Sequence, residues 1–324
     1  MSVTRTRLAA LTAAFVLLAG CGGSGDSGSG GSSGRASKDD IVAEVASFDL
    51  VVGPPSRILV GVLTGDQRFV VYGTVKFRFA YLGTKQDNRP AEYGDPVTAR
   101  FLAIPGVQPP NPMPTEPQAA SGADVRGVYA ASAGFSQAGF YQVEVTARVA
   151  GKDRTATAAF AVNDQHSVPA VGQAAPLTEN LTLTTADAPQ AAVDSRATTG
   201  GIPDPDLHQT TIATAVAAKR PSVVVFATPV YCQSRFCGPV TDMVQELSKT
   251  YADRASFIHV EIWRDFQNQT VNKAAADWLL DCRLCEPWVF LIRGDGTIAA
   301  RFDNVATTEE LEPLLKQLPV IGRT

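Results

Sequence analysis

Two of the chain's five cysteines have a spacing and a setting that suit thiol chemistry. Cys232 and Cys237 follow the apolar run 223–226, which is short, β-branched and bounded by prolines, as is typical of a strand buried on both faces. Gly238 and Pro239 come next, and proline suits the first turn of a helix. We therefore expect Cys237 at a helix N-terminus, where unpaired N–H groups and the helix dipole favour a thiolate. The short separation would let the two cysteines close a small disulfide loop.

A second pair, Cys282 and Cys285, encloses two residues and lies just before Glu286 and Pro287. Two interpretations remain open for this pair. It could exchange electrons with the first pair, or it could be a structural disulfide that fastens a loop, as exported proteins commonly carry. Zinc bound by all four thiolates is a further option. We rank it low because oxidising surroundings favour disulfides.

From residue 207 onward the chain alternates between helix and strand patterns. The clearest helix follows Pro239, with apolar side chains recurring at helical spacing as far as Tyr251. Two expected strands, 288–292 and 297–302, flank the hairpin signal RGDG. The expected order is helix, strand, helix, strand, helix, strand, strand, helix.

Over residues 207–318 this order, the cysteine loop and the position of Pro287 together resemble thioredoxin-like proteins. The resemblance implies an α/β thioredoxin-like fold, catalysis by the first cysteine pair, and a cis-proline at Pro287 that faces those cysteines. The chain departs from the family in two respects. Most thioredoxins have two residues between their cysteines where this chain has four, and Val224 lies where they often bury an acidic residue. Glu286 is our candidate for the missing proton acceptor, and either cysteine of the pair could be the nucleophile.

The first 20 residues have the features of a bacterial lipoprotein signal peptide. Two arginines precede an apolar run at 8–19 that is too short to span a bilayer as a helix. The run LAGC that ends at Cys21 resembles the lipobox, which implies removal of residues 1–20 and lipid attachment at Cys21. The alternative is a cleaved secretory signal followed by an incidental cysteine. The Gly/Ser-rich segment 21–38 is typical of a flexible tether and favours a lipid anchor on the extracytoplasmic face of the cell membrane.

Residues 39–163 have a different pattern, with about seven short strands expected between turn-rich segments. The clearest, at 140–149, alternates apolar and polar side chains, as in a sheet with one solvated face. Such strands predict a β-sandwich, and the run AGFY at 138–141 resembles a corner of immunoglobulin-like domains. Residues 164–206 are expected to be a linker. The expected fold class is thus two domains: an all-β immunoglobulin-like sandwich, then an α/β thioredoxin-like fold at 207–324.

These patterns predict a membrane-anchored, extracytoplasmic thiol-disulfide oxidoreductase. One cysteine thiolate would attack the disulfide of a client, and the other cysteine would resolve the mixed disulfide. The expected partners are protein or small-molecule thiols and disulfides and the lipid bilayer, with no cofactor and no metal. His259 is expected in a strand as a packed or surface residue. The net charge of −4 gives no sign of nucleic-acid binding.

Two other functions remain open. One is a peroxiredoxin-like thiol peroxidase, because some members of that family also place four residues between their cysteines. Its usual threonine would lie at position 229, where this chain has proline. The other is a non-enzymatic scaffold or binding lipoprotein.

Overall fold

The computed structural model describes residues 40–85, 90–122, 126–197 and 199–321. The expected signal peptide, the expected lipid attachment at Cys21 and the tether lie outside these described residues. The strands of the first half are β1 (Ile41–Val45), β2 (Gly53–Thr64), β3 (Phe69–Val71), β4 (Thr74–Gly83), β5 (Val97–Ala103), β6 (Gln118–Ala120), β7 (Gly127–Phe135), β8 (Gly139–Val149) and β9 (Lys152–Val162).

The second half contains both helices and strands. In chain order they are α1 (Gln190–Val193), η2 (Pro205–His208), α2 (Ile212–Ala217), β10 (Ser222–Phe226), α3 (Cys237–Tyr251), β11 (Ser256–Val260), β12 (Trp263–Asp265), β13 (Thr270–Val271), α4 (Lys273–Leu279), β14 (Trp288–Ile292), β15 (Ile298–Asp303) and α5 (Thr308–Lys316).

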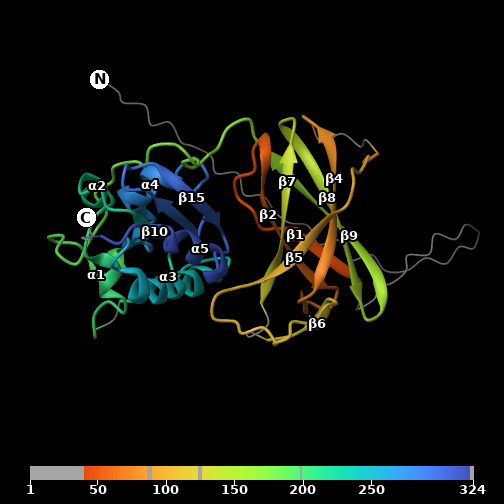
Figure 1. Ribbon diagram of the computed structural model, residues 1–324, viewed down its shortest axis with the longest axis horizontal. Coiled ribbons are helices and arrows are strands. Elements are labelled where there is room, and N and C mark those ends of the chain that lie inside the picture. Colours follow the sequence, from red (N-terminus) through yellow and green to blue (C-terminus); the bar gives the residue numbers. More distant parts are fainter. Residues whose placement is uncertain (1–39, 86–89, 123–125, 198, 322–324) are drawn as a thin grey trace, which may run out of the picture. The chain divides into compact units, whose positions relative to one another are not determined.

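In the described part of the first half, nine strands form one antiparallel sheet. The strand order is β6-β3-β2-β7-β5-β4-β8-β9, and β1 also pairs with β2 (Figure 1). The longest ladder joins β8 to β9, from Gly139 opposite Val162 to Val149 opposite Lys152. Alternate residues of β8 are buried, which is the two-residue period that the sequence predicts for this strand.

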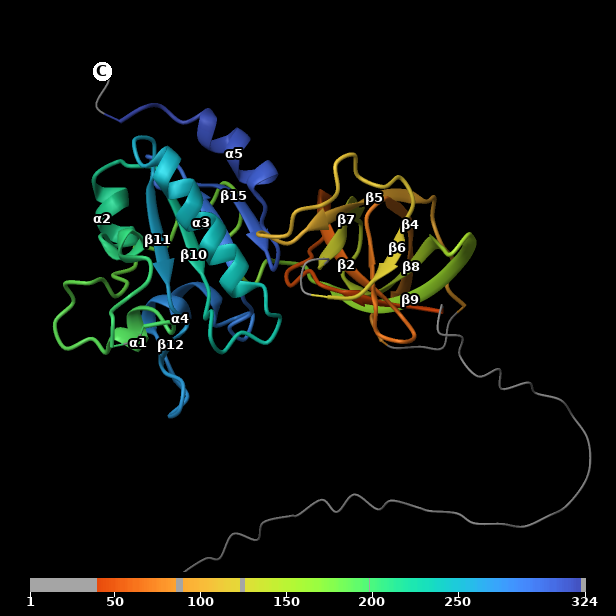
Figure 2. The same ribbon diagram turned by 90° about the horizontal axis from the view of Figure 1, so that it is seen from below.

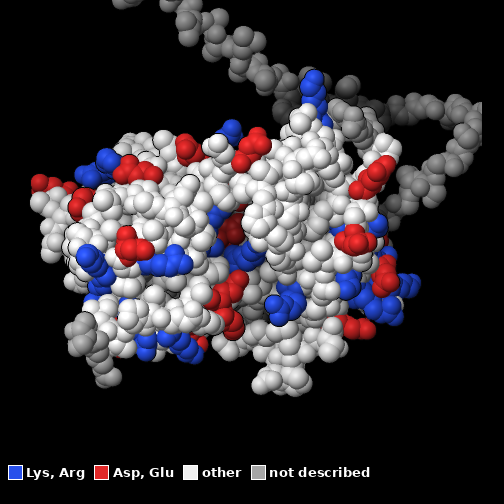
Figure 3. Space-filling model, turned by 45° about the horizontal axis from the view of Figure 1, so that its top comes forward, with Lys and Arg blue, Asp and Glu red and all other residues white. Residues whose placement is uncertain are grey.

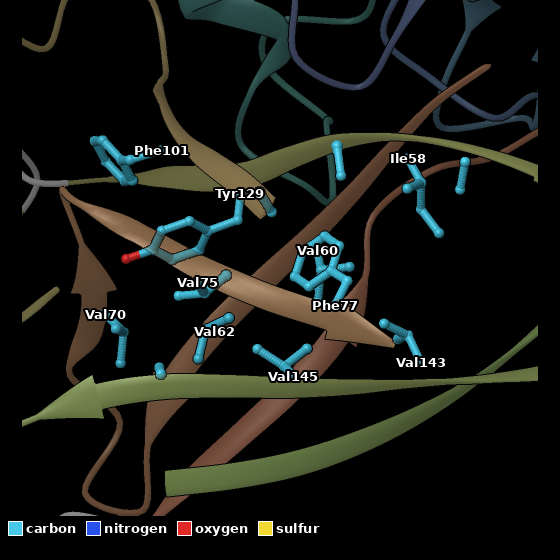
Figure 4. Packing of buried hydrophobic residues seen from close by; sticks show 14 of the residues in the cluster. Ile58, Val60, Val62, Val70, Val75, Phe77, Phe101, Tyr129, Val143 and Val145 are labelled. Carbon is cyan, nitrogen blue, oxygen red and sulfur yellow. The ribbon is translucent and has the colours of Figure 1, made fainter. Parts of the chain in front are cut away.

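The buried faces of these strands enclose an apolar core. Figure 4 shows Phe77, Tyr129, Val143 and Val145 among the side chains that meet there, and all four are completely buried. The hydroxyl of Tyr129 donates a hydrogen bond to the carbonyl oxygen of Tyr72 over 2.7 Å. This bond satisfies a polar group that would otherwise be costly to bury.

A second sheet has four strands in the order β11-β10-β14-β15. Strand β10 is parallel to β11 and antiparallel to β14, and its five residues are all buried. Val223 and Val225 belong to the cluster that contains Val244 of α3, whereas Phe226 belongs to the cluster that contains Trp278 of α4. Figure 2 shows α3 lying along the strands β10 and β11. Helices therefore cover both faces of β10, which explains its uninterrupted apolar sequence.

The expected fold class is wrong. The structure is mostly β, with about 37% strand and 16% helix, and no thioredoxin-like α/β arrangement is evident among the described residues. Helices α1, α2 and α4 have only four, six and seven residues. The immunoglobulin-like sandwich is replaced by one continuous antiparallel sheet, since β2 pairs with β7 and β7 with β5. Such pairings join residues far apart in the sequence, which a local pattern does not specify.

Residues from Ala36 to Thr324 group into one compact unit. Within the described residues, no helix has the length and apolar character needed to cross a membrane. Lysine and arginine side chains are interspersed with aspartate and glutamate over the face shown in Figure 3.

Candidate functional site

The first cysteine pair lies where β10 gives way to α3. Cys232 and Cys237 form a disulfide with their Cα atoms 6.0 Å apart. Cys237 is the first residue of α3 and is completely buried, whereas Cys232 is only half-buried in the loop before it. One sulfur of the disulfide is therefore more open to attack than the other.

A carboxyl group lies next to the buried sulfur. Strand β10 pairs with β14 so that Phe226 is opposite Trp288, and the residues just after β10 consequently face those just before β14. This pairing brings the N–H of Thr228 to Oε2 of Glu286, at 2.5 Å. The same Oε2 is 3.6 Å from Sγ of Cys237.

Glu286 is a carboxylic acid at neutral pH. Burial, together with the nearby charge of Glu261, raises the pKa of Glu286 to about 9. It can then donate a proton to the sulfur of Cys237 when that sulfur becomes a thiolate. Pro287 follows through a cis peptide bond, is buried, and accepts a hydrogen bond from the N–H of Asn304 at its carbonyl oxygen.

The second cysteine pair also forms a disulfide. Cys282 and Cys285 follow α4, with their Cα atoms 5.5 Å apart. The indole N–H of Trp288 donates to Sγ of Cys285 over 3.2 Å, and Cys282 and Cys285 both pack against the core cluster that contains Trp288. This disulfide therefore closes a short loop within the connection between α4 and β14.

An aromatic surface borders the half-buried sulfur. Tyr231, which immediately precedes Cys232, stacks on Phe266 with ring centroids 3.9 Å apart and planes 4° apart. Trp263 of β12 packs edge-on against Phe266 at 5.5 Å, and Val230 is 54% exposed. A chain that approaches Cys232 would therefore meet apolar side chains.

Beside this site lies a buried polar cluster that the sequence patterns did not predict. Asp194, Asp204, His208 and His259 bring one nitrogen or oxygen ligand atom each to within 4.8 Å of one another. Residues 164–206 were expected to be a linker, and no ligand role was expected for His208 or His259. The pattern around DPDLH at 204–208, an acid and a histidine four residues apart, was the available signal.

No protein-family model matches the chain, and no curated protein sequence matches it.

Proposed function

We propose that this chain is an extracytoplasmic thiol-disulfide oxidoreductase that acts through Cys232 and Cys237. The observation that carries the proposal is the carboxyl group of Glu286, 3.6 Å from the buried sulfur of a disulfide whose other sulfur is half-exposed. A disulfide that only fastened a loop would gain nothing from a protonated carboxyl group at that distance. Perturbed acids beside a reactive group are typical of functional sites.

The reaction balances without a further reactant. A client thiolate attacks Sγ of Cys232, a client–Cys232 bond forms, and the bond between Cys232 and Cys237 breaks. The electron pair leaves on Sγ of Cys237, which takes the proton of Glu286. A second client thiolate then attacks the client sulfur of the mixed disulfide and releases Cys232 as a thiolate. The client is oxidised and the protein disulfide is reduced; the reverse sequence reduces a client disulfide.

Serine variants test this assignment of roles. Reduced Cys237→Ser keeps the accessible Cys232 but lacks the thiol that would break a mixed disulfide. It should therefore accumulate a mixed disulfide with a fluorescent peptide that contains a single disulfide. Reduced Cys232→Ser keeps only the buried sulfur and should react at least about tenfold more slowly, as limited access predicts. Mass spectrometry of the trapped species identifies the cysteine involved.

The result that would overturn the proposal is equally specific. If Cys237→Ser reacts with the peptide disulfide no faster than the thiol of a short unfolded peptide, the site has no exchange activity. If the reduced wild type instead consumes hydrogen peroxide rapidly and ignores the peptide disulfide, the peroxidase function replaces this one.

The proposal includes a lipid anchor at Cys21. Its support is the signal-like sequence before Cys21 and the Gly/Ser-rich segment after it. Acyl chains gain about 0.8 kcal/mol per buried CH₂, so a multiply acylated terminus would hold the protein at a membrane. In a bacterial host, the full chain should fractionate with membranes and Cys21→Ser should not, while Ser24→Ala serves as the matched control. If all three proteins divide equally between the membrane and soluble fractions, the lipid anchor at Cys21 is excluded.

A further inference from the structure

Four side chains from three segments of the second half meet in the interior. Asp194 follows α1, Asp204 precedes η2, His208 ends η2, and His259 is the last residue but one of β11. All four side chains have no exposed surface. Two imidazoles and two carboxylates are thus held together out of contact with solvent.

The contacts of His259 define where a cation would bind. Its Nε2 lies 3.1 Å from the carbonyl oxygen of Ala227. A carbonyl oxygen only accepts hydrogen bonds, so Nε2 carries a proton, and Nδ1 is the ring nitrogen left to bind a second proton or a metal ion. Among the described residues, Nδ1 has no hydrogen-bond partner. It faces Oδ2 of Asp194 at 3.6 Å and Oδ2 of Asp204 at 3.7 Å. Two carboxylates around Nδ1 attract a positive charge to this point, which is either a proton on Nδ1 or a bound metal ion.

This arrangement is the one that metal-binding histidines adopt. A ligating imidazole usually donates its other N–H to a carbonyl or carboxylate, which fixes both the tautomer and the ring orientation. Ala227 supplies that carbonyl for His259. The residue directly follows β10, so the orientation of His259 is set by the sheet itself.

The separations between the four groups fit a common ion. Tetrahedral zinc has bonds of about 2.0–2.1 Å to nitrogen and oxygen, which places its ligand atoms roughly 3.3 Å apart. Nε2 of His208 is 3.2 Å from Oδ1 of Asp204 and 3.8 Å from Oδ2 of Asp194. With the distances from His259, the four nitrogen–oxygen separations span 3.2–3.8 Å. These separations involve both oxygens of Asp204, and one ligand atom from each residue lies within 4.8 Å of the others, so the cluster must contract to bring four such atoms into a tetrahedral shell.

Arg196 supports the two carboxylates from outside the cluster. Its Nη2 is 2.8 Å from Oδ2 of Asp194 and 2.6 Å from Oδ2 of Asp204, and its Nη1 extends outward to Asp242. Hydrogen-bonded partners of this kind hold ligating carboxylates in place. Arg196 itself bears no lone pair that could bind a metal.

We propose that Asp194, Asp204, His208 and His259 form a binding site for one divalent transition metal ion, with Zn²⁺ as the best fit. The ligand set of two imidazoles and two carboxylates suits zinc, and a buried site with four protein ligands is typical of a structural ion. The ion would fasten the segment 194–208 to β11. The occupant that competes with the metal is a proton on Nδ1 of His259.

The experiment uses the full chain with both disulfides intact and with Cys21→Ser, so that no thiolate can bind the metal. After treatment with a chelator, the protein is titrated with ZnCl₂ by calorimetry and with CoCl₂ by visible absorption. We expect one equivalent of Zn²⁺ to bind, and one equivalent of Co²⁺ to give the intense bands of a tetrahedral site without sulfur-to-metal charge transfer. Mg²⁺ should not compete, because it demands octahedral oxygen ligands.

Isosteric variants locate the site. Asp204→Asn should weaken Zn²⁺ binding by at least about 100-fold. Loss of a residue that only supports a ligand costs up to about 100-fold, and Asp204 is proposed as a ligand itself. Asp242→Asn is the matched control, since Asp242 contacts Arg196 but is 65% exposed and outside the cluster; its affinity should equal that of the wild type. Cys232→Ser with Cys237→Ser should also bind normally, which separates this site from the proposed exchange activity.

Three outcomes would overturn the proposal. The first is that the wild type binds no Zn²⁺, which would mean that a proton on Nδ1 of His259 occupies the cluster in place of a metal ion. The second is unchanged affinity in Asp204→Asn. The third is a Co²⁺ spectrum without tetrahedral bands, which is decisive even if Asp204→Asn fails to fold.

Discussion

At the scale of single residues, Glu286 determines whether the Cys232–Cys237 bond can open efficiently. Sulfur that leaves a disulfide as a thiolate in a buried setting carries a charge away from water, and the N-terminus of α3 offsets only part of that cost. Cys237 is completely buried, and Oε2 of Glu286 is 3.6 Å from its Sγ. Proton transfer from Glu286 would remove that charge at the moment it forms.

Replacement of Glu286 by glutamine should therefore slow reduction of the disulfide. Glutamine has the same shape but cannot donate a proton as an acid, so we expect a loss of about tenfold to a hundredfold, at the lower end of general acid catalysis. The rate of reduction by a water-soluble phosphine, followed through free thiols, measures the effect.

The pH dependence provides the control. Because the pKa of Glu286 is raised to about 9, the group is protonated at neutral pH and loses its proton as the pH rises through that value. The ratio of the wild-type rate to the Glu286→Gln rate should be largest near pH 7 and approach one above pH 10. A ratio that is constant over this range would assign Glu286 a purely structural role.

Sequence reasoning found some of these residues and missed others for a physical reason. Cys232, Cys237 and Glu286 are close to distinctive signals, namely an apolar strand, a helix start and a proline. Asp194 and Asp204 lie in a segment without helical or strand periodicity, and their neighbours in space come from β11. No spacing along the chain specifies that contact.

At the scale of secondary-structure elements, the same limit explains the error in fold class. The uninterrupted apolar run of β10 and the helical spacing in α3 were sufficient to locate both elements, because burial imposes a period on each. Pairing between strands is different. Strand β2 pairs with β7, about 70 residues later, and many registers would bury the same alternating side chains. The continuous nine-stranded sheet therefore could not be distinguished from a sandwich.

The second disulfide belongs to this scale, because it closes a short loop in the connection between α4 and β14. We expect Cys282→Ser with Cys285→Ser to lower the free energy of unfolding by about 2 kcal/mol, the chain-entropy value for so short a loop. Urea unfolding measures this loss. The same double change in the Cys237→Ser background should leave the rate of mixed-disulfide formation unaltered. The opposite result would be a Cys282→Ser, Cys285→Ser variant that keeps Cys232 and Cys237, is as stable as the wild type, and oxidises or reduces its client more slowly. That result would identify Cys282 and Cys285 as an electron relay.

At the scale of the whole molecule, Arg57 links the large sheet to the segment that leads into α5. From β2, its Nη1 donates to Oε1 of Glu310 over 2.6 Å, and its Nη2 donates to the carbonyl oxygens of Asp303 and Val305 at 2.8 and 2.5 Å. The guanidinium group also lies 5.4 Å from the ring centroid of Phe302. The Arg57 side chain is only 20% exposed, so these contacts are screened less than those of a surface pair.

Arg57→Met should therefore weaken the coupling between the two sheets. Methionine retains part of the apolar stem but leaves the carboxylates of Asp303 and Glu310 without their shared cation. We expect a loss of about 2–3 kcal/mol, between the values for an exposed and a buried ion pair. Arg78→Met is the matched control, because Arg78 pairs with Glu144 within the large sheet and is 42% exposed. Its loss should be below about 1 kcal/mol.

Two probes can distinguish loss of coupling from simple loss of stability. The three tryptophans, at positions 263, 278 and 288, all lie in the second half, so their fluorescence follows the four-stranded sheet and its surroundings. Far-ultraviolet circular dichroism instead reports all the strands, most of which belong to the large sheet. The urea transitions from the two probes should coincide in the wild type and in Arg78→Met, as cooperative unfolding requires. In Arg57→Met they should separate, because each sheet then unfolds at its own stability; coincident transitions in this variant would show that other contacts couple the two sheets.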